Sequence, residues 1–298
     1  MTRVNELIII LIIYKENLKE LRVNRVMYNE LDGKNKKTCE LDYEEMNSYL
    51  FAIMDIGELL LMHGAEVSRV EDTIMRLCSA YGVARSDVFT ITSSIVVTVM
   101  SAEGKAITQT RRVRERNTDL GKVAKVNALS RRICAEPIAL EDFRKKIQEI
   151  QNMKQAPVLL HLGMYMMISA SLSVFFGGTW WDGFAAALSG IVLFAALRGS
   201  TALKLNSIIQ SMICSGITAA AVLLLVRAGI GVHPDKIMIG NIMLVIPGIQ
   251  LTTSLRDMIN GDIISGLLNM SEALLKAIAV AMGFTIILLI GGGGCSLI

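Results

Sequence analysis

Polar and ionisable side chains gather in one otherwise apolar stretch of the chain, from Val245 to Lys276. Pro247 lies inside this stretch, and because proline lacks a backbone donor and clashes one turn back, a helix should kink or break there. A helix that breaks inside a membrane exposes backbone groups and helix ends that can bind ions and carboxylates. The candidate substrate or coupling residues around the break are Pro247, Gly248, Thr252, Ser254, Arg256, Asp257, Gly261, Asp262, Glu272 and Lys276.

Two kinds of chemistry would suit these side chains. Arg256 or Lys276, together with exposed backbone N–H groups, could hold the carboxylate of a small substrate. Asp257, Asp262 or Glu272 could carry a coupling proton, because partial desolvation favours the protonated form of a carboxyl group. Ionisable groups at membrane depth cost about 2.5–3.5 kcal/mol on insertion scales, so they usually have a function.

Simpler interpretations exist for the same residues. Arg256 and Asp257 would fit equally well in an ordinary loop between two membrane spans. Glu272 and Lys276 are four residues apart, so they could pair with each other on one helix face. Both interpretations stay open at the level of the sequence.

A second motif lies in the first half of the chain, in the string HGAEVSRVEDTI. Its candidate residues are Gly64, Glu66, Arg69, Glu71 and Asp72. Glu66, Arg69 and Asp72 are spaced by three on an expected helix, which predicts an acid–base–acid ladder. Such a ladder is either a salt-bridge network or a docking face and gate against the apolar half.

No motif points to an enzyme. The chain has no phosphate-binding loop, no HExxH sequence, no nucleophile elbow and no quartet of metal ligands, so we expect no catalytic residue, cofactor or metal. A net charge of +3 is too small to indicate nucleic-acid binding. Five cysteines without a CxxC pair are typical of reduced thiols.

The elements that must position these residues divide at Pro157. Only eleven Asp, Glu, Lys and Arg side chains follow Pro157, out of 57 in the chain. Five hydrophobic segments occupy this second half, near 157–176, 180–197, 207–227, 236–255 and 263–290, and each is close to the length of about 20 residues that a span needs. Basic residues precede the first segment and are absent from the next connection, which places the first half in the cytosol.

The first half has the pattern of a small α+β domain. Apolar residues at helical spacing predict helices over about 42–64, 66–81, 119–134 and 140–153. The stretch between the second and third of these is rich in β-branched residues and contains Gly104, which predicts strands with a hairpin turn. The domains expected are therefore an extension, 1–42, which is disordered, amphipathic or the product of an upstream start; a cytosolic α+β domain, 43–154; and an all-α transmembrane bundle, 155–298.

Three segments together resemble the threonine/serine exporter (ThrE-type) family, in particular its larger YjjP-type subunit. They are Gly64 to Ile74 (GAEVSRVEDTI), the following DVFTITSSIVV, and Pro247 to Gly266 (PGIQLTTSLRDMINGDIISG), within a similarity that spans roughly Tyr43 to Gly291. The resemblance implies a cytosolic domain followed by about five spans, in a bacterial cytoplasmic (inner) membrane. It implies export of threonine and serine or of succinate-like dicarboxylates.

The resemblance also implies a partner. Full-length members of the family carry about ten spans, and split members work with a second, smaller membrane subunit of about four spans, which we expect here. A homo-oligomer and a proton-coupled mechanism are further expectations. The alternative is a membrane scaffold or sensor that does not transport, with a cytosolic domain that binds a ligand or partner; a passive channel is a third interpretation.

Overall fold

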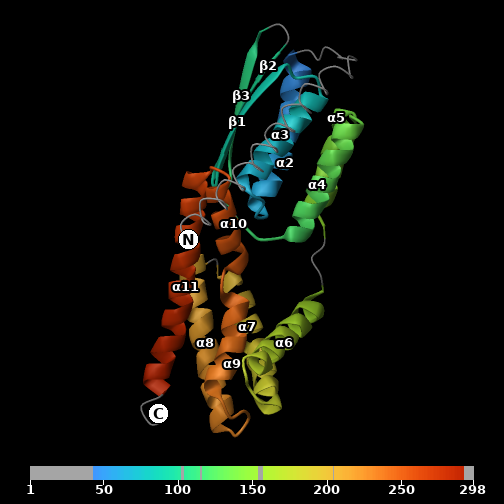
Figure 1. Ribbon diagram of the computed structural model, residues 1–298. Coiled ribbons are helices and arrows are strands. Elements are labelled where there is room, and N and C mark those ends of the chain that lie inside the picture. The colour runs from blue at the N-terminus through green and yellow to red at the C-terminus, as the bar shows by residue number, and fades with distance from the viewer. Residues whose placement is uncertain (1–42, 102–103, 115, 154–156, 204, 292–298) are drawn as a thin grey trace, which may run out of the picture.

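The protein consists of two parts stacked along its long axis, as the computed structural model in Figure 1 shows. The structure describes residues 43–101, 104–114, 116–153, 157–203 and 205–291. The extension expected over 1–42 lies outside the described residues. Among these described residues, four helices and a three-stranded sheet form the upper part of the molecule, and six helices form the lower part, as Figure 1 shows them arranged.

The upper part is built on a helical hairpin packed against one face of the sheet. Its helices are α2 (Tyr43–Met62), α3 (Val67–Ala80), α4 (Leu120–Ala135) and α5 (Leu140–Gln151). Its strands are β1 (Arg85–Ile91), β2 (Ser94–Met100) and β3 (Ala106–Arg112), antiparallel in the order β1-β2-β3. Alternate residues of β2, namely Ile95, Val97 and Val99, are buried in the core shared with α2 and α3. This agrees with the α+β pattern of the sequence.

Turns explain where these elements end. Gly64 has φ +88°, which suits glycine, and the N–H of Ala65 donates to Leu60 O at 3.0 Å, so α2 ends in a left-handed cap. The expected turn at Gly104 is present, because Ser101 N donates to Lys105 O at 2.9 Å. The sequence does not predict the β1–β2 turn at Thr92 and Ser93, because neither glycine nor proline marks it and the residues on both sides are rich in β-branched side chains.

The lower part is a bundle of apolar helices. Its members are α6 (Val158–Phe175), α7 (Trp180–Ala202), α8 (Ser207–Arg227), α9 (Pro234–Val245), α10 (Gly248–Ile259) and α11 (Ile263–Gly291). Four of them, α6, α7, α8 and α11, are long and apolar enough to cross a membrane. The pair α9 and α10 passes the same test only together, so the described residues give four spans, or five if this bent pair counts as one.

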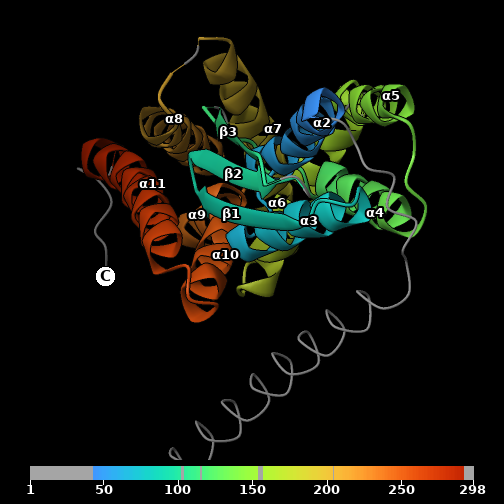
Figure 2. The same cartoon turned by 90° about the horizontal axis from the view of Figure 1, so that it is seen from above.

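The fourth predicted segment, near 236–255, is two helices in the structure, and they separate at Pro247, where the sequence predicts a kink or break. Pro247 ends the first helix because it cannot donate a backbone hydrogen bond, and the two axes differ by 51°. The other predicted segments agree with α6, α7, α8 and α11 to within a few residues at their ends. Viewed from above, the sheet and α2–α5 lie over the bundle, with α11 at one side and α4 and α5 at the other (Figure 2).

Candidate functional site

The break between α9 and α10 has the geometry of a tight turn followed by a new helix. Gly248 N donates to Ile246 O at 2.8 Å across Pro247, and Leu251 N donates to Pro247 O at 3.0 Å. The first N–H groups of any helix have no partner inside that helix, so the start of α10 presents backbone donors at the bend. Pro247 and Gly248 thus position a helix end in the way the sequence predicts.

The hydroxyl groups near the break are bonded to their own helix. Thr252 Oγ1 donates to Ile249 O at 2.9 Å, and Ser254 Oγ donates to Gln250 O. Thr252 is exposed, whereas Ser254 is fully buried. These hydroxyls keep lone pairs as acceptors, but their protons are already used inside α10.

A polar network connects α10 to α11. Glu272 and Lys276 form an ion pair at 2.7 Å, as the simpler interpretation of their spacing predicts. Lys276 Nζ also donates to Gln250 Oε1 at 3.3 Å, and Gln250 Nε2 donates to Asn269 O at 3.4 Å. Lys276 therefore reaches the first turn of α10, close to the break, and its side chain is only 18% exposed.

Arg116 joins this network from the upper part of the molecule. It lies in the segment between β3 and α4, and its Nη1 donates to Oδ1 of Asn269, a buried residue of α11. We define the α10–α11 polar network as Arg116, Gln250, Asn269, Glu272 and Lys276. Arg116 and Gln250 were not singled out from the sequence, because neither belongs to a motif or to a recognisable spacing.

The two sequence motifs meet at the junction between the upper and lower parts. Arg256 at the end of α10 forms an ion pair with Glu66, which precedes α3. The N–H of Val67, the first residue of α3, donates to Asp257 Oδ1 at 3.3 Å, so a carboxylate lies at the positive end of a helix. We call this set of contacts the domain junction.

A third contact completes the junction. Asn260 Nδ2 donates to Ser68 Oγ at 3.3 Å. Arg256 and Asp257 lie on the last turn of α10 and bind the upper part, so they are not residues of a free loop. Arg256 is nine residues beyond Pro247, or about 13 Å along the helix axis, so it lies well away from the break.

The expected acid–base–acid ladder is not one network. Arg69 is 3.9 Å from Glu66, but Asp72 pairs with Arg76 at 2.8 Å. Asp72 turns toward Arg76 because that partner lies four residues further along the same exposed face. Of the expected ladder, only Glu66 reaches the lower part of the molecule.

Glu71 lies close enough to Asp262 for the two carboxylates to interact electrostatically. Glu71 accepts a hydrogen bond from Thr90 N at 2.7 Å. Burial raises the pKa of Glu71, and the negative charge of Asp262 raises it further, while the bond from Thr90 lowers it. The connection between α10 and α11 therefore places an additional carboxylate beside a half-buried one.

Two glycines shape the connection between α10 and α11: Gly261 lies in the turn before Asp262, and Gly266 lies in the first turns of α11. Gly261 has φ +102°, and Asp262 N donates to Asp257 O at 2.9 Å, which closes α10 with a left-handed cap. At Gly266 an added Cβ would lie 2.7 Å from Ser254 O and 2.5 Å from Met258 Cγ. The absence of a side chain at Gly266 therefore lets α10 and α11 pack closely.

At the opposite end of the bundle, hydrogen bonds to one carboxylate connect the start of α7 to the loop before α9. Buried Asp182, near the start of α7, accepts from Val232 N at 2.6 Å and from His233 N at 2.9 Å. It also forms a capping box with Thr179. The capping box is a local feature, whereas the bonds from Asp182 to a loop some fifty residues later depend on how the helices pack and cannot be predicted from local spacing.

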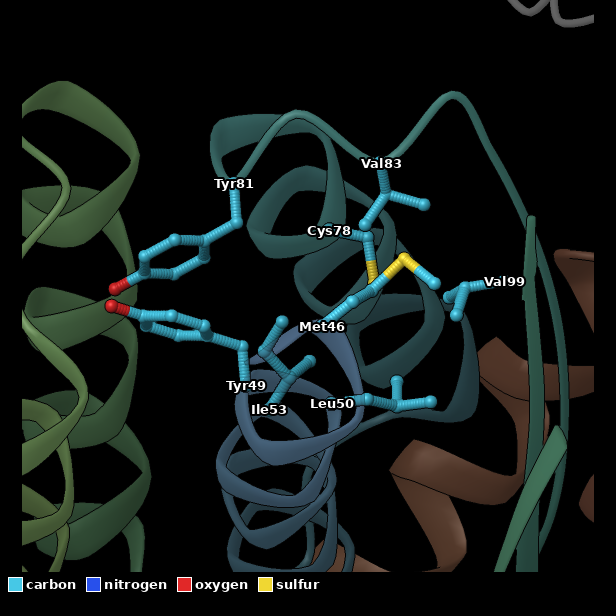
Figure 3. Close-up of a pocket in the computed structure, with 8 residues that line it drawn as sticks. All are labelled: Met46, Tyr49, Leu50, Ile53, Cys78, Tyr81, Val83 and Val99. Atoms are coloured by element: carbon cyan, nitrogen blue, oxygen red, sulfur yellow. The ribbon is translucent and has the colours of Figure 1, made fainter. Parts of the chain in front are cut away.

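One small cavity lies in the core of the upper part of the molecule. The cavity in Figure 3 lies between α2, α3 and β2, with Tyr49 and Tyr81 side by side at its edge. Its volume of about 10 Å³ is room for one water at most. Within the described residues, no group of three or more His, Cys, Asp or Glu side chains could hold a metal ion.

The several apolar helices of the described residues are those of a multi-pass membrane protein, and a helix broken inside the bundle with an ion pair near the break is a feature found in transporters. The chain belongs to the threonine/serine exporter family: the ThrE family profile matches residues 52–291. This match covers both the domain junction and the α10–α11 polar network.

Relatives with assigned names fall into two groups by length. The chain is 26% identical over 261 residues to the probable succinate transporter subunit YjjP of Escherichia coli (strain K12), a match that covers 84% of this chain and 97% of that protein. It is 24% identical over 251 residues to the threonine/serine exporter of Corynebacterium glutamicum, which covers 81% of this chain and 51% of that protein. The chain thus corresponds to nearly all of the shorter relative and about half of the longer one. No solved structure matches the chain.

Proposed function

We propose that this protein is the larger subunit of a two-component secondary exporter of small carboxylated metabolites, either threonine and serine or succinate-like dicarboxylates, coupled to the proton gradient. The observation that carries the proposal is the break at Pro247, together with Lys276, which pairs with Glu272 and bonds to Gln250 in the first turn after the break. Broken helices at a membrane midplane bind carboxylates at the N-terminus of one half-helix. The names of the relatives supply the two substrate classes.

The proposed binding site lies at the first turn of α10. Lys276 is the cation nearest to it, because its Nζ bonds to Gln250, the third residue of α10. A substrate carboxylate would accept from the free backbone N–H groups of this turn and from Lys276 Nζ. Glu272 holds Lys276 in place and is, with Asp257 and Asp262, a candidate carrier of the coupling proton.

The upper part of the molecule is proposed to be cytosolic. Basic residues before α6 support this orientation, as does the large polar surface of α2–α5. The helix α11 supports it as well: its 29 residues extend roughly 43 Å, longer than a hydrocarbon core of about 30 Å. Its first turns, with Asp262 and the domain junction, would then lie at the cytosolic surface.

The partner is proposed to be a separate membrane subunit of about four spans. The chain covers 97% of a relative that is itself named a transporter subunit, whereas it covers only half of a longer exporter. The remaining spans of the longer exporters would correspond to the second subunit.

Efflux measurements test the proposal. Cells that carry the protein with its partner are loaded with labelled threonine, serine or succinate, and we expect faster efflux of at least one of them than from cells without the protein. Lys276→Gln should lower efflux at least tenfold, because a charged hydrogen bond contributes about 1.5–3 kcal/mol. Asp262→Asn should reduce the dependence of efflux on the proton gradient.

The controls separate transport from other functions. Arg256→Ala removes a cation that lies at the domain junction, away from the break, so its effect should be weaker than that of Lys276→Gln. Equal efflux in wild type, Asp262→Asn and Arg256→Ala would remove both residues from the mechanism. Efflux equal to that of empty cells for all three labels would favour the alternative function, a membrane scaffold or sensor.

A further inference from the structure

We infer that Arg116, supplied by the upper part of the molecule, is a binding residue for the substrate carboxylate at the cytosolic mouth of the site between α10 and α11. This inference rests on the proposed function and adds to it a residue from outside the membrane helices. Arg116 lies 153 positions before its partner Asn269 in the sequence. It is the member of the α10–α11 polar network that comes from the upper part of the molecule.

The first step is the position of Arg116. Its segment is held on both sides: Val113 N donates to Ser93 O at 2.8 Å, and Asn117 N donates to Met62 O at 2.8 Å. Asp119 N adds a bond to His63 O at 3.2 Å. These bonds hold Val113 and Asn117, on either side of Arg116, and the Arg116 side chain reaches Asn269 of α11.

The second step is the unused bonding capacity of the guanidinium. A guanidinium has five N–H donors, and one of them is bonded to Asn269 Oδ1. Within the part of the chain that the structure describes, no carboxylate lies within ion-pair distance of Arg116, although Glu272 and Asp257 are near enough to interact with it electrostatically. Arg111 and Arg256, in contrast, are both paired with carboxylates. Arg116 is partly desolvated, which lowers its pKa, but it keeps part of its surface exposed, so its remaining N–H donors can receive a carboxylate from solution.

The third step is the continuity of the network. Arg116 bonds to Asn269, Asn269 to Gln250, and Gln250 to Lys276. Gln250 lies in the first turn of α10, where free N–H groups face the break. A substrate that leaves the cytosol would meet the cation of Arg116 first and that of Lys276 next, along one continuous polar path.

The test compares three variants in the efflux assay with labelled threonine, serine and succinate, at a range of internal substrate concentrations. Arg116→Gln keeps an N–H donor for Asn269 but loses the charge, and we expect its KM to rise about tenfold with little change in maximal rate. Arg116→Lys keeps the charge but cannot donate two parallel N–H bonds to one carboxylate. Its KM should therefore lie between those of wild type and Arg116→Gln. Arg114→Gln, two residues away on the same exposed segment, should keep the wild-type KM within twofold.

A purely structural role of Arg116 predicts a different result. Loss of a tether would lower the maximal rate and leave KM unchanged, and Asn269→Ala would then reproduce the effect of Arg116→Gln. An unchanged KM in Arg116→Gln, with efflux present in wild type, would overturn the inference and leave the proposed function intact. Absence of efflux in wild type would instead refute the proposed function, and this inference with it.

Discussion

At the scale of single residues, Glu71 combines a structural and an electrostatic role. It accepts from the backbone N–H of Thr90, which lies on β1 at the edge of the sheet and is buried. Glu71→Ala would leave this donor without a partner, at a cost of about 1–3 kcal/mol. We expect Tm to fall by about 5 °C, measured by thermal unfolding of the purified protein in detergent.

Glu71→Gln separates the effect of the charge from that of the hydrogen bond. Glutamine keeps an acceptor for Thr90 N but cannot ionise. Burial raises the pKa of Glu71, so the folded state holds the proton more tightly than the unfolded state, and stability falls as pH rises through the unfolded and then the folded pKa. The variant should therefore exceed wild type in Tm at pH 7–8 and equal it near pH 4. Parallel Tm curves between pH 4 and 8 would contradict this assignment.

At the scale of elements, the hairpin of α10 and α11 depends on close approach at Gly266. An added methyl group would meet backbone atoms of Ser254 and Met258, which cannot move without shifting a helix. We expect Gly266→Ala to destabilise the protein by about 1–3 kcal/mol through overpacking. Detergent melting curves of the variant measure the effect directly.

The matched control is Gly163→Ala in α6. Apart from the backbone of α6 itself and the two neighbouring residues, no atom of the described residues lies within 4 Å of an added Cβ at Gly163, so the substitution should be neutral or slightly stabilising, since alanine favours helix. Equal Tm values for the two variants would show that α10 and α11 do not pack closely at Gly266.

The same elements show how far a sequence predicts this structure. The break at Pro247, the cap at Gly64 and the pair Glu272–Lys276 follow from rules that act within a few residues, and the structure contains all three. The contact of Glu66 with Arg256 joins residues 190 positions apart, and Arg116 reaches Asn269 across 153. Such pairs depend on how two domains pack, which no local spacing encodes. The error at Asp72 has a different, local cause: Arg69 and Arg76 lie three and four residues from it, both within reach on a helix, and the structure pairs it with Arg76.

At the scale of the whole molecule, the domain junction connects the upper part directly to the helix that follows the break. Ser68 at the start of α3 and Asn260 at the end of α10 have side-chain atoms 3.3 Å apart. Transporters with broken helices alternate between open states by moving one group of helices against another. If α10 moves during transport, its contact with the upper part must open in each cycle.

A reversible cross-link tests this motion. In a background without the five native cysteines, Ser68→Cys with Asn260→Cys should form a disulfide on oxidation. We expect oxidation to abolish efflux of the transported label and a reductant to restore it. The control pair is Thr98→Cys with Thr108→Cys, whose hydroxyl oxygens are 2.9 Å apart between β2 and β3, so its disulfide stays within the sheet and should leave efflux unchanged. Full efflux from protein fully cross-linked at the junction would mean that α10 and the upper part move as one body, and that the moving group of helices lies elsewhere in the bundle.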